Sequence, residues 1–131
     1  MSPSSKRPSL DFRIDQAKTA LADARVLLAN GGTAQSVINR AYYSMFYAAL
    51  GLLQRNELVP KKHSGVLRHF DKEYILSGKI DRRFSKDIHA AFDLRMMSDY
   101  QAVSATMEEA RDLVERAQAF IEAAEKLLVA P

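Results

Sequence analysis

Arg95 occupies a position where helical spacing predicts an apolar residue. Phe84, Ile88 and Ala91 are four and three residues apart, which marks the inward face of an amphipathic helix, and position 95 continues that stripe. An isolated buried charge is very costly, so a guanidinium here must be paired or must line a cleft. Its forked donors fit a phosphate. Alternatively, Arg95 caps its own helix or pairs with Asp99 four residues on.

His63 falls on a comparable inward position. It continues backwards the apolar stripe that contains Val66, which places it at the N-terminal end of a helix. The helix dipole there disfavours protonation, so we expect a neutral imidazole that lines a site or bonds to the backbone. His63, His69 and His89 are six and twenty residues apart, which matches no common metal-ligand spacing, so we expect no metal site.

Tyr42, Tyr43 and Tyr47 lie on one predicted helix and allow two interpretations. Tyrosines can form a stacking platform for bases, but on a central helix they more often belong to the core. The glycine-rich motifs of the common nucleotide-binding folds and the G-x-S-x-G motif of hydrolases do not occur. Residue types and spacing alone therefore indicate a helical protein with one oddly placed arginine.

The elements that position these residues are all predicted to be helical. Apolar stripes at helical spacing and their capping signals predict an all-α, up-and-down bundle of four to five antiparallel helices. Residues 1–9 are polar and interrupted by proline, so we expect a disordered tail before one domain over 10–131. The expected helices are about 10–29, 33–55, 62–76, 81–97 and 106–128, with a break over 98–104.

Capping residues and a core follow from the same pattern. Thr33 and Asp81 are predicted to cap their helices, and Thr106 with Glu109 has the pattern of a capping box. The large apolar residues on the inward stripes are expected to be buried: Phe46, Leu50, Phe70, Phe84, Ile88, Phe92, Leu113 and Phe120.

Composition excludes several classes of protein. The chain has 131 residues, enough for one domain, and no cysteine, which removes thiolate zinc sites and disulfides. Its longest uncharged stretch is 14 residues, whereas about 20 are needed to cross a bilayer, so we expect no membrane association and a cytoplasmic protein. Nine lysines and arginines face five acids between residues 55 and 89. This basic middle is either a solvated surface or a phosphate contact.

The chain resembles HEPN domains over about residues 11–128. The matching pieces are AYYSMFYAA at 41–49 within the helix that starts near Ala34, KHSGV at 62–66, RMMSDY at 95–100 and AQAFI at 117–121. The resemblance implies a helical bundle that usually dimerises and often pairs with a minimal nucleotidyltransferase in toxin–antitoxin modules.

Catalytic members of that family are metal-independent ribonucleases with an R-x(4–6)-H motif. The arginine holds the scissile phosphate and the histidine assists attack by the 2′-hydroxyl. Arg95 matches the arginine, but Tyr100 stands where the histidine is expected, and Met96 replaces a residue that is often polar. Tyrosine has a reference pKa near 10 and is a poor general base at neutral pH.

Two functional hypotheses result. In the first, the chain is a toxin-like partner of a nucleotidyltransferase whose cleft binds a nucleotide or RNA phosphate through Arg95, Asp99, Tyr100, His63 and Tyr43, with weak or lost ribonuclease activity and no cofactor. Any residual catalysis is assigned to Arg95 and Tyr100. In the second, it is a non-catalytic binding or scaffold bundle in which Arg95 forms a structural ion pair.

Overall fold

Five α-helices and one π-helical turn make up the chain in the computed structural model. The model describes residues 6–100 and 104–129, with backbone only for 6–11 and 129. The elements are α1 (Lys6–Ala29), α2 (Ala34–Arg55), α3 (His63–Phe70), η1 (Asp71–Ile75), α4 (Arg82–Tyr100) and α5 (Met107–Val129). No strand occurs in the described residues. The all-α prediction is confirmed.

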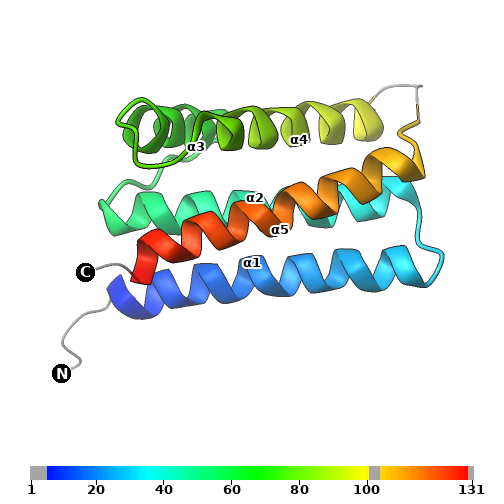
Figure 1. The fold of residues 1–131 in the computed structure, drawn as a ribbon, viewed down its shortest axis with the longest axis horizontal. Coiled ribbons are helices and arrows are strands. Elements are labelled where there is room, and N and C mark those ends of the chain that lie inside the picture. The colour runs from blue at the N-terminus through cyan, green and yellow to red at the C-terminus, as the bar shows by residue number, and fades with distance from the viewer. Residues whose placement is uncertain (1–5, 101–103, 130–131) are drawn as a thin grey trace.

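The long helices form an up-and-down bundle. In Figure 1, α1 and α4 run in one direction and α2 and α5 in the other, with the start of α1 and the end of α5 at the same end of the bundle. The short α3 lies beside the first half of α4 and leads the chain from α2 across to it. The predicted antiparallel order of the successive long helices is thereby confirmed.

α2 is the centre of the bundle. It contacts α1, α3, α4 and α5, and from Ala41 to Leu53 nearly all of its residues are buried. Its side chains are apolar almost all round, and a helix of that kind is stable only when neighbours cover every face. Two tyrosines, Tyr43 and Tyr47, are only half-buried and mark the one side of α2 that is incompletely covered.

Local signals set the helix ends as expected. The Ser36 backbone N–H donates to Thr33 Oγ1 over 3.1 Å. The Thr106 side chain accepts from the Glu109 backbone N–H at 3.1 Å, and the Glu109 side chain accepts from the Thr106 backbone N–H at 2.9 Å. Gly31 closes α1 with a φ of +79°, a conformation that side chains with a Cβ rarely adopt. These caps confirm the predicted boundaries between α1 and α2 and before α5.

Two boundaries differ from the prediction. α1 begins at Lys6 and includes part of the segment expected to be a disordered tail. Pro8 is tolerated because the first N–H groups of a helix have no partner within it. α4 continues to Tyr100, past the break predicted at residue 98. The Ser98 hydroxyl donates to the Leu94 carbonyl over 2.9 Å and is satisfied inside the helix.

The third predicted helix consists of two parts. α3 ends at Phe70 and the chain continues as the π-helical turn η1, in which the Leu76 backbone N–H donates to the Asp71 carbonyl over 2.8 Å. Tyr74 fixes this turn to the end of α2, because its hydroxyl donates to the Leu52 carbonyl over 2.7 Å. Such wide turns are rare and occur often at functional sites.

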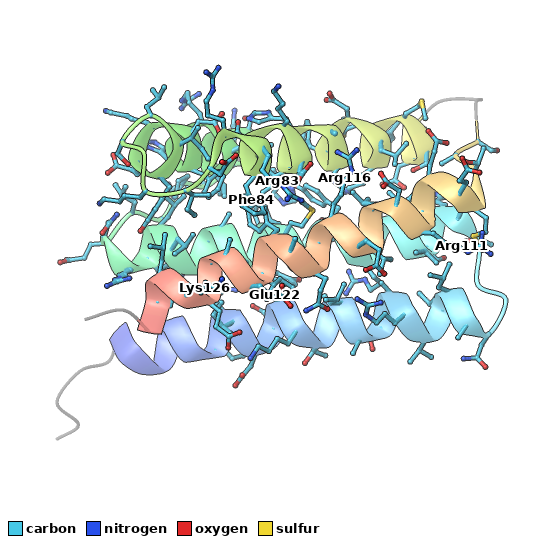
Figure 2. The ribbon with its side chains drawn as sticks, in the orientation of Figure 1. Arg83, Phe84, Arg111, Arg116, Glu122 and Lys126 are labelled. Atoms are coloured by element: carbon cyan, nitrogen blue, oxygen red, sulfur yellow. The ribbon has the colours of Figure 1, made fainter. Side chains whose placement is uncertain are left out.

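The predicted core is confirmed for six of its eight residues. Phe84 and Phe92 are the exceptions, since both are only half-buried. Both lie on α4, whose buried residues are confined to Asp87, Ile88 and Ala91. Figure 2 shows Phe84 beside Arg83 in the space between α4 and α5, at an edge of the core that long polar side chains also fill. The six buried residues are Phe46, Leu50, Phe70, Ile88, Leu113 and Phe120.

Candidate functional site

Arg95 lies between α4 and the incompletely covered side of α2. Its guanidinium carbon is 5.5 Å from the ring centre of Tyr42 and 5.2 Å from that of Tyr43. Its side chain is only 16% exposed. Aromatic faces attract a cation and hold the planar guanidinium in place. Arg95 therefore faces inward, as its place on the stripe predicts, and packs against two tyrosine rings.

Asp99 is the only acid paired with Arg95 in the described part of the chain. Its Oδ2 lies 3.3 Å from Arg95 Nε, one helical turn away. Nε nevertheless has no hydrogen-bond acceptor although it is buried, because its N–H is not directed at that oxygen. The other carboxylate oxygen, Oδ1, accepts a hydrogen bond of 3.0 Å from Gln35 Nε2. Asp99 thus offsets the charge of Arg95, while the N–H donors of Arg95 remain without an acceptor among the described residues.

His63 enters the same site from the first residue of α3. Its Nδ1 lies 3.1 Å from the hydroxyl of Tyr42, and its ring packs 4.2 Å from the ring centre of Phe46. Burial, and secondarily the positive charge of Arg95, lower the pKa of His63 below 6.5. The expected neutral imidazole is supported, but its partner is a tyrosine hydroxyl, not the backbone.

The tautomer of His63 depends on the direction of its hydrogen bond with Tyr42. Burial raises the pKa of Tyr42, so its hydroxyl keeps its proton at neutral pH. No other hydrogen bond of that hydroxyl is seen among the described residues, so we infer that it donates to Nδ1. A neutral imidazole that accepts at Nδ1 carries its proton on Nε2. His63 therefore offers this site an N–H donor and not a free basic nitrogen.

Tyr43 connects the Arg95 region to a neighbouring cavity. The guanidinium of Arg40 lies 5.3 Å from the centre of the Tyr43 ring, so two arginines contact one ring. Arg40, Gln35 and Asp99 also line a cavity of about 340 Å³. That volume lies within the range of small-ligand sites, about 300–1,000 Å³. The arrangement can hold an anion between charged and N–H donors beside an aromatic face.

The structure brings together four of the five residues predicted for the site: Arg95, Asp99, His63 and Tyr43. Tyr100 is not among them, because it ends α4 with 70% of its surface exposed, and no hydrogen bond, ion pair or ring contact joins its side chain to the other four. Gln35 and Arg40 also belong to the site, although they were not predicted from the sequence. They lie on the same helix as Tyr43, eight and three residues before it, a helical spacing that could have pointed to them.

Neither a membrane-spanning helix nor a cluster of metal ligands occurs in the described residues. No helix there has a stretch long and apolar enough to cross a bilayer. No three histidine, cysteine, aspartate or glutamate side chains of that part of the chain come together as metal ligands would. Asp71, Ser85 and His89 do form a polar cluster, in which both other side chains bond to the carboxylate, at 2.6 and 2.7 Å.

Known proteins are similar in sequence to most of this chain. A protein of Thermotoga maritima named "UPF0332 protein" is 34% identical over 124 residues, which cover 94% of this chain and 93% of the relative. "Putative toxin MJ0142" of Methanocaldococcus jannaschii is 36% identical over 121 residues, 92% of this chain and 82% of the relative. "Putative toxin MJ0605" of the same organism is 31% identical over 122 residues, 93% and 90% of the two chains.

The family of the chain follows from its whole length. The sequence model of the HEPN domain matches residues 10–127, which include every helix that contributes to the Arg95 site. The resemblance drawn from the tyrosine-rich helix and the R-x-x-x-D-Y segment is confirmed, and this chain belongs to the HEPN domain family.

Proposed function

We propose that this chain is a toxin-like HEPN protein that acts in the cytoplasm. Its Arg95 site binds the phosphate of a nucleotide or of RNA, and its ribonuclease activity is weak or absent. The relatives named "Putative toxin" support the toxin-like role, since they align with more than nine-tenths of this chain. The family's frequent pairing with a minimal nucleotidyltransferase supports a partner of that kind.

The unused donors of Arg95 carry this proposal. A guanidinium has five N–H donors, and no described residue accepts a hydrogen bond from this one. Of these, Nε–H is buried, and leaving a buried donor unsatisfied costs free energy, which an anionic ligand would recover. A phosphate oxygen fits because charge-assisted hydrogen bonds to guanidinium are strong and often paired. The Nε2–H of neutral His63 supplies a further donor.

The tautomer of His63 and the position of Tyr100 argue against efficient RNA cleavage. Attack by a 2′-hydroxyl requires a group that accepts its proton, and loss of such a base typically lowers the rate by about 10²- to 10⁴-fold. Nδ1 of His63 is hydrogen-bonded to Tyr42, and in the inferred tautomer Nε2 carries the proton. Tyr100 is exposed at the end of α4. Binding without efficient turnover follows from this arrangement.

We also propose a homodimer formed through the open side of α2. Arg40 lines both the cavity next to Asp99 and a second cavity lined by Phe12 and Tyr47, so the two cavities adjoin. Phe12 is exposed and Tyr47 is half-buried. An obligate dimer would cover such a surface with about 2,000 Å² or more of interface. Light scattering should give about twice the 14.7 kDa chain mass, and a mass near 15 kDa would contradict the dimer.

The test of the proposed function is a binding titration with adenosine monophosphate and a 12-nucleotide unstructured RNA. Arg95→Ala should weaken binding at least tenfold, and the melting temperature should stay within a few degrees. Arg111→Ala is the matched control, because Arg111 is an exposed cation on α5. The wild type should leave the RNA uncut in the presence of EDTA. Unchanged affinity of the Arg95→Ala variant would contradict the proposed site.

The scaffold hypothesis is the second candidate, favoured by the ion pair between Arg95 and Asp99. Two half-buried residues at 3.3 Å on successive turns can serve stability alone. In that case, Arg95→Ala would lower the melting temperature by many degrees, and neither probe would bind the wild type. The titration and the melting curve therefore separate the two functions.

A further inference from the structure

The lysines and arginines that lack an intramolecular partner are concentrated on one part of the molecule. Most cations in the described residues pair with an acid, an amide or an aromatic ring, as Arg25 does with Glu115 and Arg116 with Asp112. Those without a hydrogen bond, ion pair or ring contact fall mainly on α3, η1, the start of α4 and the loop before α3. They are Lys61, Lys62, Arg68, Lys72, Arg82 and Lys86, with Arg111 and Lys126 on α5 as the others.

Four of these cations lie on two helical segments that follow each other along the chain, α3 with η1 and the start of α4. Arg68 and Lys72 are exposed one turn apart along α3 and η1, and Arg82 and Lys86 are exposed one turn apart on α4. We call these four residues the α3–α4 basic face. Two of them, Arg82 and Lys86, line a groove of about 670 Å³, whose other lining residues are Asp71, Ile75, Leu76 and Ser85.

The one acid in this groove is already occupied. Asp71 Oδ1 accepts a hydrogen bond of 2.6 Å from the Ser85 hydroxyl, and Oδ2 lies 2.7 Å from His89 Nε2. The carboxylate therefore fastens η1 to α4 and leaves Arg82 and Lys86 without an ion pair. A fold that needed these cations for its own stability would have paired them. Their free donors are available to an outside anion.

The chemistry of the groove favours a phosphate backbone over the alternatives. No aromatic side chain lines it, so it offers no stacking surface for bases, and contacts to phosphate are sequence-independent. An anionic membrane is less suitable, because Leu76 is the only exposed large apolar side chain along this face. Lys61 and Lys62 directly precede His63, so the free cations continue along the chain towards the Arg95 site.

We propose that the α3–α4 basic face binds the RNA backbone outside the Arg95 site. It contributes affinity without sequence preference, while the Arg95 site holds one phosphate in a defined geometry. The inference rests on the proposed function only in taking RNA as the polyanion. It predicts a longer footprint than the Arg95 site alone could give, with a salt dependence set by the free cations.

The experiment compares two double variants of the full chain with a fluorescently labelled 20-nucleotide unstructured RNA. R82Q/K86Q removes two cations of the basic face, and R111Q/K126Q removes the two free cations on α5, which Figure 2 shows near opposite ends of that helix. We expect R82Q/K86Q to bind about tenfold more weakly at 50 mM salt. The slope of log affinity against log salt should become shallower by about 1.4, or about 0.7 for each lost contact on a single strand. The α5 control should change neither quantity.

The outcomes distinguish this surface from the Arg95 site. If R82Q/K86Q weakens RNA binding while adenosine monophosphate still binds with wild-type affinity, the two sites are separate as proposed. If Arg95→Ala leaves RNA binding unchanged and R82Q/K86Q abolishes it, the Arg95 site fails and the basic face stands.

Three results would overturn the basic face. They are equal losses in R82Q/K86Q and the α5 control, no loss in either R82Q/K86Q or R68Q/K72Q, and binding of phosphatidylserine vesicles without binding of RNA. Circular dichroism of each variant shows whether it is folded. R68Q/K72Q provides the second test on the neighbouring segment if the first variant does not fold.

Discussion

The two halves of α4 differ in which residues they bury and in how they hold their cations. The first half carries all the buried residues of the helix, Asp87, Ile88 and Ala91, and keeps its outer cations Arg82 and Lys86 free. From residue 92 to Tyr100 every residue is half-buried or exposed. Its one cation, Arg95, is nevertheless held between two tyrosine rings and an aspartate.

This difference shows that one amphipathic stripe along a helix can contribute to the core in its first half and to a binding site in its second. Where neighbouring helices cover the stripe on all sides, it stabilises the fold by burial of apolar surface. Where they leave it partly open, a charged residue can occupy the same stripe and still reach a ligand. Free cations on the opposite face have no fixed geometry, so they supply attraction, whereas the fixed Arg95 supplies orientation.

The contrast between the two halves of α4 would be wrong if both contributed equally to the free energy of unfolding. Ile88→Ala, in the fully buried half, should lower the free energy of unfolding by about 3 kcal/mol because it leaves a cavity. Phe92→Ala should cost about 2 kcal/mol, less than a fully packed phenylalanine, because its ring is half-buried. Urea denaturation followed by circular dichroism measures both. An equal or larger loss for Phe92→Ala would show that the second half is also core.

The buried carboxylate of Asp87 allows a second test of the first half. Arg116 Nη1 donates to Asp87 Oδ1 over 2.8 Å, while Arg83 Nε is 3.8 Å from the other oxygen. Arg116→Met should destabilise the fold by about 2 kcal/mol, since it leaves a buried charge poorly paired. Adding Asp87→Asn should recover part of that loss. If Arg116→Met left the free energy of unfolding unchanged, the carboxylate of Asp87 would be adequately paired without Arg116.

The contact between Tyr42 on α2 and His63 on α3 provides a test of the site that Arg95, in the second half of α4, enters. Tyr42→Phe should lower the free energy of unfolding by about 1 kcal/mol, because His63 Nδ1 loses its donor. Tyr43→Phe is the matched control, since the Tyr43 hydroxyl has no hydrogen-bond partner among the described residues. Nitrogen NMR of the imidazole should show the proton on Nε2 in the wild type. A proton on Nδ1 would contradict the tautomer that makes His63 a donor.

The smallest expected effect is on the pH dependence of stability. The pKa of His63 is lowered in the folded protein by burial and by Arg95, so the unfolded chain takes up the proton first as pH falls. Stability from this residue is therefore complete above about pH 6.5 and declines below it. Arg95→Met should raise the His63 pKa, as measured by proton NMR. His63→Gln should flatten the decline; an unchanged pH profile would assign it to other groups.

Local sequence was sufficient for the framework of the molecule. The caps at Thr33 and Thr106, the closing Gly31 and the inward position of Arg95 depend on residues within a turn or two. Helical periodicity reports which face of a helix is covered, so six of the eight expected core residues were correct. It overestimated the burial of Phe84 and Phe92, because periodicity reports direction and not how far a neighbouring helix extends over the stripe.

The sequence by itself determined that this protein is a helical bundle with an arginine on an inward stripe. It could not determine what that arginine meets. Only the tertiary structure decided that Tyr43 lies against Arg95, that Tyr42 fixes His63 and that Gln35 bonds to Asp99 across 64 positions of the chain. The physical reason is that a helix specifies its own faces through local hydrogen bonds and spacing, whereas contacts between helices depend on how their side chains interlock and on the angle at which they cross.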